Sequence, residues 1–234
     1  MTAKKLSPRL QAVSDLVPNG SIMADIGSDH AYVPAYLLKR DLIKYAIAGE
    51  VAPGPLKNAT SEMEEQHLTD KMTTRLGDGL DVINPDDHVN AIVIAGMGGE
   101  LITQILERGK HKLTDQTALI LQPNVDEIRL RRWLVSNQYG IKAENIVFDA
   151  GHFYEMMLAK PVVKRVEYSK QELRFGPVLL KQKNPEFIDK WTDRIRKNKV
   201  VLNNLNNATN PPLDKIRHIQ KINAELKEIL NDHS

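Results

Sequence analysis

The chain has 234 residues, and 32 Lys and Arg against 30 Asp and Glu give it a net charge of +2. With 41% hydrophobic and 26% charged residues, the composition is that of a globular protein and excludes a disordered or collagenous chain. Cysteine is absent, which excludes disulfides, thiolate metal sites and cysteine catalysis. No apolar stretch approaches the ~18 residues of a membrane helix, and the polar start shows no signal peptide. We therefore expect a cytoplasmic protein that binds neither membrane nor metal.

Short apolar runs alternate with helical stretches through the first two thirds of the chain. Ser7 and Pro8 predict a capped helix that runs to Val17. Strands are expected at residues 21–26, 45–49, 73–76, 91–95 and 118–121. Helices are expected between them at residues 34–40, 55–66, 100–108 and 125–137. Because most strand runs are apolar on both faces, the pattern predicts a doubly wound α/β sheet with a mostly parallel order.

Two later runs, at residues 141–148 and 154–159, are joined by the short turn-rich segment 149–152. So short a link joins only antiparallel strands, since a parallel pair needs a longer crossover. A mostly parallel sheet that ends in an antiparallel hairpin is typical of Rossmann-like methyltransferases, whereas a nicotinamide dehydrogenase more often continues with crossover helices. This is an analogy between folds and does not by itself establish chemistry.

From residue 185 the pattern changes to helical heptads. The first seam has 3-4-3-4-3 spacing and one polar position, and comprises Ile188, Trp191, Ile195, Asn198, Leu202 and Leu205. The second stripe comprises Ile216, Ile219, either Ile222 or Asn223, Leu226, and either Ile229 or Leu230. Residues 206–212 break the pattern between them, so we expect an antiparallel α-helical coiled-coil hairpin. The sequence thus predicts an α/β domain over residues 1–160 and a helical domain over residues 161–234.

The charges divide between the two predicted domains. Residues 1–159 carry 16 basic and 21 acidic side chains, a net charge of −5, and residues 160–234 carry 16 and 9, a net charge of +7. The basic side chains gather around the first heptad helix: Lys181, Lys183, Lys190, Arg194, Arg196, Lys197 and Lys199. Such a cluster suits a phosphate backbone. A solvated helical face and a dimerisation hairpin are the alternatives.

In open α/β sheets, ligands bind beyond the carboxyl ends of the strands. The first strand ends in A-D-I-G-S-D-H-A, residues 24–31, which has only Gly27 of a dinucleotide-binding G-x-G-x-x-G. Asp29 would repel a pyrophosphate but would tolerate a cationic sulfonium or amino group. The alternative is an ordinary turn with Asp29 as a helix cap. After the second strand, Glu50 has the spacing of a carboxylate that binds ribose hydroxyls, with a solvated strand-end glutamate as the alternative.

Three further strand ends carry polar or glycine-rich segments. Asp78, between two glycines, could accept a hydrogen bond from an adenine amino group, although D-G is also a common turn. The segment 94–100, I-A-G-M-G-G-E, leaves the backbone bare for a flat ligand, unless it is a mobile glycine turn. Gln122 and Asn124 place two amides on the same rim, either as substrate contacts or as helix caps.

The series L-S-P-R-L, A-D-I-G-S-D-H-A, A-G-E, G-D-G-L, I-A-G-M-G-G and L-Q-P-N, in this order, resembles the bacterial tRNA adenine-N1 methyltransferases that modify position 22, the TrmK type. The resemblance covers roughly residues 5–160, and the appended helices fit it. It implies a class I methyltransferase domain, an S-adenosylmethionine cofactor and a helical extension that helps to hold tRNA. The cofactor contacts that we expect are Asp25, Gly27, Ser28, Glu50, Asp78, Gly79, Ala95, Gly96 and Met97. The expected substrate contacts are Arg9, Gly98, Gly99, Gln122, Asn124, Tyr154, Lys190, Arg194 and Lys197.

Asp29 and His30 are the expected catalytic residues. The segment A-G-M-G stands where enzymes that methylate exocyclic amino groups carry [DN]-P-P-[FY], which favours attack by a ring nitrogen. Adenine N1 can attack the sulfonium methyl directly, so the enzyme's main task is alignment. Asp29 would stabilise the cationic product, and His30 would orient the Asp29 carboxylate or the base, with a helix-start histidine without such a role as the alternative.

The target adenine of a folded tRNA must be extruded before it reacts. Tyr32, Phe153 and Tyr154 are candidates to stack on it, with aromatic core packing as the alternative. Arg9 would contact a phosphate or the base, with a plain surface arginine as the alternative. A non-catalytic RNA-binding protein and a small-molecule methyltransferase are the other functions that the sequence allows. We expect a monomer, with a dimer through the hairpin as the alternative.

Overall fold

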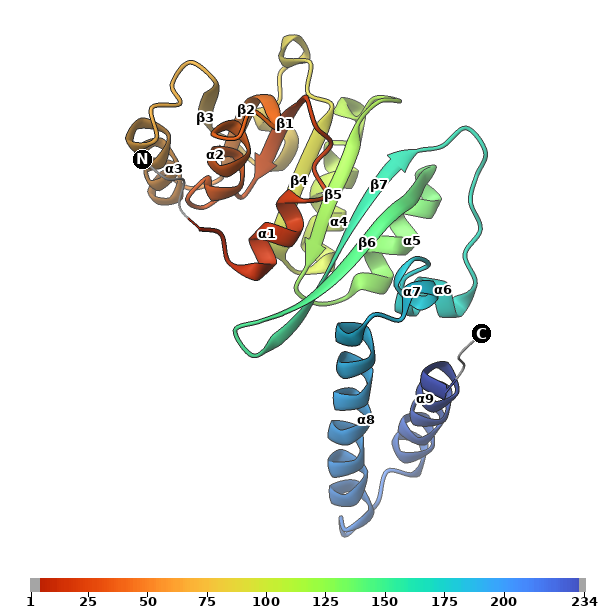
Figure 1. Cartoon of the computed structure of the whole chain (residues 1–234). Helices are drawn as coiled ribbons and strands as arrows, with labels where there is room; N and C mark the ends of the chain where they lie inside the picture. Colours follow the sequence, from red (N-terminus) through yellow and green to blue (C-terminus); the bar gives the residue numbers. More distant parts are fainter. Residues whose placement is uncertain (1–4, 232–234) are drawn as a thin grey trace. The chain divides into compact units, whose positions relative to one another are not determined.

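The computed structural model describes residues 5–231 (Figure 1). The chain divides into two compact units between Val178 and Leu179. The first residues of the polar start, on which the expectation of no signal peptide depends, lie outside this described part. Within it, no helix is both long and apolar enough to cross a membrane. The two units are described separately below.

The first unit is built on a 7-stranded sheet with the order β3-β2-β1-β4-β5-β7-β6. The strands are β1 (Ser21–Ile26), β2 (Ile43–Glu50), β3 (Met72–Leu76), β4 (Ala91–Met97), β5 (Ala118–Pro123), β6 (Tyr139–Asp149) and β7 (His152–Pro161). The pairs among β1 to β5 are parallel, and β7 is antiparallel to both β5 and β6. The predicted α/β class and its antiparallel hairpin are confirmed.

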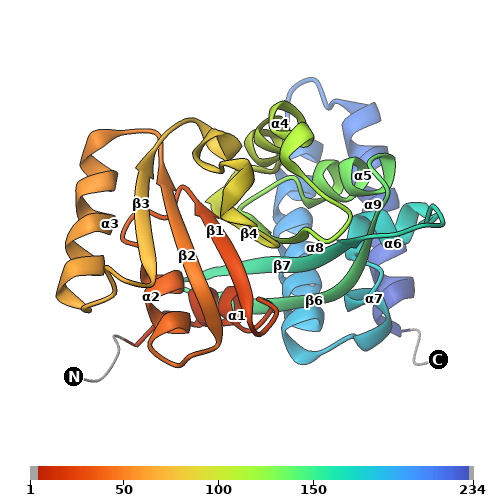
Figure 2. The same cartoon turned by 90° about the horizontal axis from the view of Figure 1, so that it is seen from above.

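Helices cover both faces of this sheet (Figures 1 and 2). They are α1 (Pro8–Ser14), α2 (Tyr32–Leu38), α3 (Pro53–Glu65), α4 (Gly99–Arg108), α5 (Glu127–Ser136) and α6 (Lys170–Phe175). The 3-10 turns η1 (Gly79–Val82) and η2 (Pro85–Asp87) lie between β3 and β4, and η3 (Lys110–Lys112) lies between α4 and β5. Ser7 caps α1 as predicted, because its hydroxyl accepts from the Leu10 N–H at 3.3 Å. The turns and α6 were not predicted.

The core has two layers because alternate strand residues face opposite sides of the sheet. In β4, Val93 packs with residues of α1, α2 and α3, whereas Ile92 and Ile94 pack with residues of α4 and α5. All three side chains are buried. A strand that is buried on both faces reads as a continuous apolar run, which explains why these runs were visible in the sequence.

The first unit extends past the expected domain limit at residue 160, to Val178. A fully buried arginine, Arg131 of α5, donates to Glu144 of β6 at 2.8 Å and to the Leu173 carbonyl at 3.4 Å. The Val178 N–H donates to the same Glu144 carboxylate at 2.8 Å. Because these hydrogen bonds tie the segment after β7 to the sheet, it belongs to the α/β unit rather than to the helical one.

The second unit contains α7 (Leu179–Gln182), α8 (Pro185–Asn206) and α9 (Leu213–Asn231). Asn198 of α8 donates to Asn223 of α9 at 2.8 Å, and Asn223 is buried. The seam position of α9 for which the sequence allowed Ile222 or Asn223 is therefore occupied by Asn223. The expected seam is wrong at its first position, since Ile188 is 42% exposed. Phe187 is buried there instead, because a residue four positions before Trp191 lies on the same face of a helix with 3.6 residues per turn.

Candidate functional site

The loops after β1 and β4 lie side by side where the strand order reverses. β1 and β4 are adjacent and parallel, with Ile26 opposite Ile94 near their carboxyl ends. The chain passes from β1 to β2 and β3 on one side, and β5 follows β4 on the other (Figure 1). Such a reversal leaves a crevice at the carboxyl ends of the strands, where open α/β sheets bind ligands.

Gly27 is the point where these two loops touch. Its φ of +70° lies in the left-handed region, and its N–H donates to the Gly49 carbonyl at 2.9 Å. A Cβ at this position would lie 2.2 Å from the Met97 methyl carbon. The left-handed φ favours glycine here, and any larger residue would also have to displace the end of the Met97 side chain, so the backbone of the first loop is bare on the side that faces the second loop.

Two buried carboxylates lie at the adjoining ends of β1 and β2. Asp25 and Glu50 are each 5% exposed. Burial, and secondly the negative charge of Glu50, raises the pKa of Asp25 to about 7. The Glu50 carboxylate accepts from the Asp29 N–H and lies 3.5 Å from the Ser28 hydroxyl. Glu50 is therefore no solvated strand-end residue, and it holds the first loop in place.

Asp29 and His30 stand at the rim of this loop. Asp29 has a φ of 55° and a side chain that is 71% exposed. It is not a helix cap: the N-cap of α2 is Ala31, without a side-chain hydrogen bond. The His30 Nε2 lies 3.8 Å from the Asp29 carboxylate, and its ring stacks on Tyr32 with 5.0 Å between centroids. The rim thus presents a carboxylate to solvent with an imidazole beside it.

Hydrogen bonds from two amide side chains hold the loop after β4. The Gly96 N–H donates to the Gln122 Oε1 at 3.0 Å, and the Asn124 Nδ2 donates to the Gly96 carbonyl at 2.7 Å. Neither amide caps α5, whose N-cap residue is Asp126. The interpretation of Gln122 and Asn124 as helix caps is therefore wrong.

The glycines at the start of α4 lie against the segment after β5. The Gly99 N–H donates to the Val125 carbonyl at 2.9 Å. A Cβ at Gly99 would lie 2.4 Å from the Asp126 carbonyl oxygen, and one at Gly98 would lie 3.9 Å from the Val125 side chain. The expected substrate glycines thus bring two strand ends together. Ala95, before them, pairs with Gln122 in the sheet.

Arg9 reaches this edge from α1. Its Nη1 donates to the Gln122 Oε1 at 2.7 Å, and its guanidinium carbon lies 5.4 Å from the centre of the Tyr154 ring. Its backbone N–H donates to Asp149 at 3.2 Å. Arg9 is therefore no plain surface arginine. Asp149 was missed by the sequence reasoning, although its place at the predicted hairpin turn was a signal.

Asp78 has a partner that competes with the role expected for it. Both of its carboxylate oxygens accept from Arg108 of α4, at 2.6 and 2.9 Å. The pair is exposed, and Gly79 next to it begins η1. An adenine amino group would have to share or replace the Arg108 contact. No pattern in the sequence pointed to this pair, since 30 positions separate the two residues.

The expected substrate contacts Lys190, Arg194 and Lys197 lie on α8 of the second unit. Lys190 lies 5.0 Å from the centre of the Trp191 ring. Lys197 pairs with Asp193 at 2.7 Å, and Lys197 together with Arg196 lowers the pKa of that carboxyl. Arg194 is exposed. The exposed ion pair between Lys197 and Asp193 contributes little to stability, so little is lost if Lys197 leaves it to contact a phosphate.

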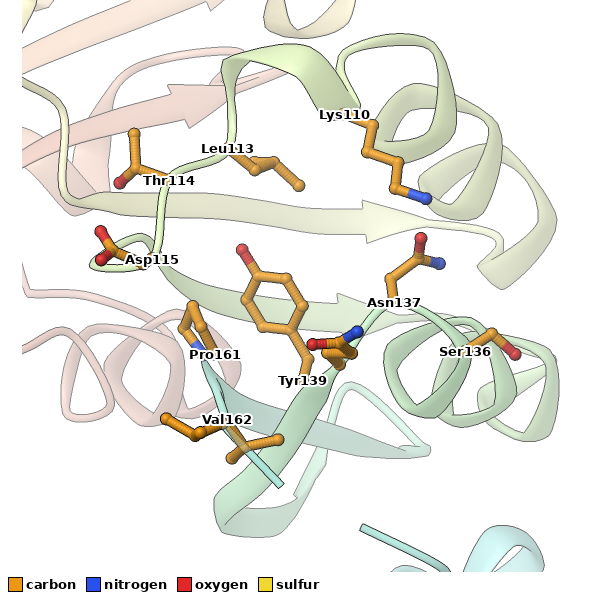
Figure 3. A pocket seen from close by; sticks show the side chains of 11 residues that line it. Lys110, Leu113, Thr114, Asp115, Ser136, Asn137, Tyr139, Pro161 and Val162 are labelled. Carbon is orange, nitrogen blue, oxygen red and sulfur yellow. The ribbon is translucent and has the colours of Figure 1, made fainter. Parts of the chain in front are cut away.

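The structure also contains a cavity of about 580 Å³ at the opposite edge of the sheet (Figure 3). Its lining comes from Lys110, from Leu113 to Asp115, from Ser136 to Tyr139 and from Pro161 to Val163. It contains none of the expected site residues. Burial raises the pKa of Tyr139 to about 12. Among the described residues, no group of His, Asp and Glu side chains is arranged to hold a metal ion.

The sheet order, the antiparallel β7 and the ligand-facing loops at the strand reversal define a Rossmann-like methyltransferase. The sequence model of the family described as tRNA (adenine(22)-N(1))-methyltransferase matches residues 23–229. The chain belongs to this family, and it is an S-adenosylmethionine-dependent enzyme that methylates N1 of an adenine in tRNA.

Three relatives illustrate the similarity. The tRNA (adenine(22)-N(1))-methyltransferase of Bacillus subtilis is 39% identical over the full length of both chains. The structure of Streptococcus pneumoniae Sp1610 in complex with S-adenosyl-L-methionine is 39% identical, with a TM-score of 0.88 over 97% of this chain and 100% of that one. M. capricolum TrmK in complex with S-adenosyl-homocysteine is 29% identical, with a TM-score of 0.84 over 97% and 99%.

Proposed function

We propose that this chain methylates N1 of adenine 22 in tRNA at the carboxyl edge of its sheet, with Asp29 as the catalytic carboxylate. The observation that carries the proposal is the arrangement of two carboxylates with different environments. Glu50 is buried and accepts from the Asp29 N–H, while the Asp29 side chain is 71% exposed at the rim. The buried carboxylate thus fixes the backbone of the exposed one.

The residues around the first loop fit the cofactor. Gly27 leaves the backbone bare, and the pair formed by Asp25 and Glu50 provides acceptors for hydroxyl or ammonium groups. When bound, S-adenosylmethionine supplies an electrophilic methyl group on a cationic sulfur. We assign Ser28, Gly79 and Met97 to the same edge as further contacts. These residues include buried carboxylates and no lysine or arginine. They therefore favour the binding of a cation over the binding of a pyrophosphate.

The catalytic work of the chain is alignment and charge stabilisation. Adenine N1 carries an in-plane lone pair, so the reaction needs no covalent intermediate. Asp29 accepts a hydrogen bond from the N6 amino group and stabilises the positive charge that develops on the ring. His30 lies beside that carboxylate and orients it. Arg9 and Tyr154 present a cation and a ring face to the extruded nucleotide.

Asp29→Asn tests this assignment without disturbing the loop. Asparagine tolerates the left-handed φ of 55° and has the same shape as aspartate, whereas alanine would add backbone strain. We expect kcat for adenine-22 methylation, mapped by nuclease digestion, to fall at least 100-fold. The Kd for S-adenosylhomocysteine should stay within threefold. The control is Asp86→Asn on the exposed turn η2. A kcat within tenfold of the unmodified protein would contradict the role of Asp29.

The basic side chains of α8 are proposed to hold the tRNA backbone. Support comes from the exposed Arg194 and Lys199 and from the net charge of the second unit, since residues 179–234 carry 11 basic and 7 acidic side chains, a net charge of +4. Changing both residues to Glu should weaken tRNA binding at least tenfold and reduce its salt dependence. The matched control places the same changes at Lys215 and Lys221 on α9, which are also exposed. Equal loss in both variants would show only a general charge effect.

We further propose that the chain works in the cytoplasm as a monomer. The location is supported by the tRNA substrate of the family. A dimer through the second unit is the alternative outcome, since Val200, Val201 and Leu213 are exposed apolar residues of its helices. Light scattering over a range of protein concentrations measures the mass directly, and a dimer mass throughout would overturn the monomer.

A further inference from the structure

We propose that Gln122 is a positioning residue, which holds Arg9 and the loop of residues 96–99 in one fixed arrangement for methyl transfer. This inference rests on the proposed location of methyl transfer at this edge. It differs from a direct substrate contact, because Gln122 has an exposed fraction of 0%. Any effect of Gln122 on the reaction must therefore pass through the residues that it contacts.

The Gln122 Oε1 accepts from two donors that belong to separate elements. One is the Arg9 Nη1 of α1 at 2.7 Å, and the other is the Gly96 N–H in β4 at 3.0 Å. A Cβ at Gly96 would lie 3.3 Å from that same Arg9 nitrogen. The guanidinium and the glycine backbone therefore lie against each other with one shared acceptor between them. No other contact in the described part of the chain joins Arg9 to this loop by hydrogen bonds.

The second half of the amide fixes its orientation. The Gln122 Nε2 donates to the Asn124 Oδ1 at 3.1 Å, and the Asn124 Nδ2 donates to the Gly96 carbonyl at 2.7 Å. In addition, the Asn124 N–H donates to the Met97 carbonyl at 2.7 Å. The two amides thus form a chain of hydrogen bonds that begins at the Gly96 N–H and ends at the Gly96 carbonyl. A flipped Gln122 amide would set donor against donor at Arg9.

The chemistry of the contacts specifies glutamine. An apolar side chain of the same length would leave a guanidinium N–H and a backbone N–H without an acceptor inside the fold, which is unfavourable. Glutamate would keep the acceptor for both donors but would lose the donor to Asn124. The expected order of function is therefore glutamine, then glutamate, then methionine, which matches the length of glutamine without its amide.

The first experiment needs neither cofactor nor tRNA. Hydrogen exchange at the Gly96 amide, followed by NMR in the free protein, reports directly on its bond to Gln122. In Gln122→Met we expect exchange at Gly96 to be at least tenfold faster, with unchanged exchange in the distant strand β3. The control is Gln116→Leu, an exposed position before β5. Unchanged exchange at Gly96 in a folded Gln122→Met protein would overturn the proposed contact.

The second experiment measures kcat for tRNA methylation and the Kd for S-adenosylhomocysteine. We expect kcat to fall at least tenfold in Gln122→Met and less in Gln122→Glu, while the Kd stays within threefold. Combining Gln122→Met with Arg9→Ala should lower kcat by less than the product of the two single effects, because part of the effect of Gln122 passes through Arg9. Effects that multiply, or a Kd that rises as much as kcat falls, would overturn the positioning role.

Two further outcomes keep the test decisive. If Gln122→Met does not fold, Asn124→Ala at an exposed position replaces it, with the same expected direction for kcat and for exchange at Gly96. A variant that loses thermal stability but keeps full kcat would show a purely structural role and would overturn the proposal. Failure of the wild-type protein to methylate adenine 22 would instead refute the proposed function, and the hydrogen-exchange result would still stand.

Discussion

The substitution Asp25→Asn should stabilise the protein at neutral and higher pH. Burial and the charge of Glu50 raise the pKa of Asp25 from 3.8 to about 7. Between these values the folded state holds a proton that the unfolded state has released, so Asp25 makes stability fall as pH rises from about 4 to about 7. One pKa unit corresponds to about 1.36 kcal/mol. Asparagine does not titrate and escapes this loss.

The expected difference between Asp25→Asn and wild type therefore depends on pH. Between pH 5 and pH 8 it should grow in favour of the variant by a few kcal/mol, because the part of this interval below the raised pKa of about 7 is where wild type loses stability. Groups whose titration is unchanged by the substitution cancel, because the two proteins are compared at the same pH. The increase with pH, rather than the absolute stability, is the quantity that tests the reasoning.

Urea unfolding at several pH values measures this difference. The chain has two tryptophans, and a Trp191→Phe background leaves Trp133 of α5 as the fluorescent reporter of the α/β unit. The exposed Asp86→Asn variant is the matched control and should show no trend with pH. A stability difference for Asp25→Asn that is the same at pH 5 and pH 8 would refute the raised pKa. We also expect weaker binding of S-adenosylhomocysteine, since the variant loses a carboxylate at the proposed cofactor edge.

Two further predictions follow from close contacts in the α/β unit. Gly27→Ala places a Cβ 2.2 Å from the Met97 methyl carbon at a φ of +70°. Binding of S-adenosylhomocysteine, measured by calorimetry, should therefore weaken at least tenfold. An unchanged affinity would contradict the close approach of the two loops. Arg131→Met leaves the carboxylates of Glu144 and Glu155 together in the core, where both now accept from Arg131. Unfolding in urea should show a loss of about 3–5 kcal/mol, and a loss below about 1 kcal/mol would contradict the buried charge cluster.

The strands of the first unit could be predicted because their side chains are buried on both faces. The run from Ser21 to Ile26 coincides with β1, and the other predicted strands differ from the observed ones mainly at their ends. Element ends depend on local contacts that periodicity does not contain. Helix α5 begins at Glu127 rather than at Val125, because Asp126 adopts a φ of 65° just before it. The helix α6 was missed because it is short, although Ser169 and Glu172 form a capping box.

The location of the site could be predicted from the sequence, but the hydrogen bonds between its side chains could not. The carboxyl ends of parallel strands converge at one edge, so the sequence sufficed to bring together the loops that contain Gly27 and Gly96. It could not show that Gln122 accepts from Arg9, since 113 positions separate the two residues. Nor could it show that Arg108 occupies the Asp78 carboxylate. Contacts between distant polar side chains leave no periodic trace, and any of several partners would satisfy the same groups.

The near-zero net charge of the chain is a sum of two opposite values, and the chemistry of the proposed function explains why they belong to separate parts. A cationic cofactor is best held beside carboxylates, and Asp25 and Glu50 are buried at the edge where we place it. A large excess of basic side chains at that edge would lower the local affinity for a cation by like-charge repulsion, and the two arginines that reach it, Arg9 and Arg108, donate to Gln122 and Asp78. A polyanionic substrate has the opposite requirement. The exposed cations of α8 belong to the second unit, whereas the buried carboxylates belong to the first. The chain can therefore bind a polyanion through one unit and a cationic cofactor through the other.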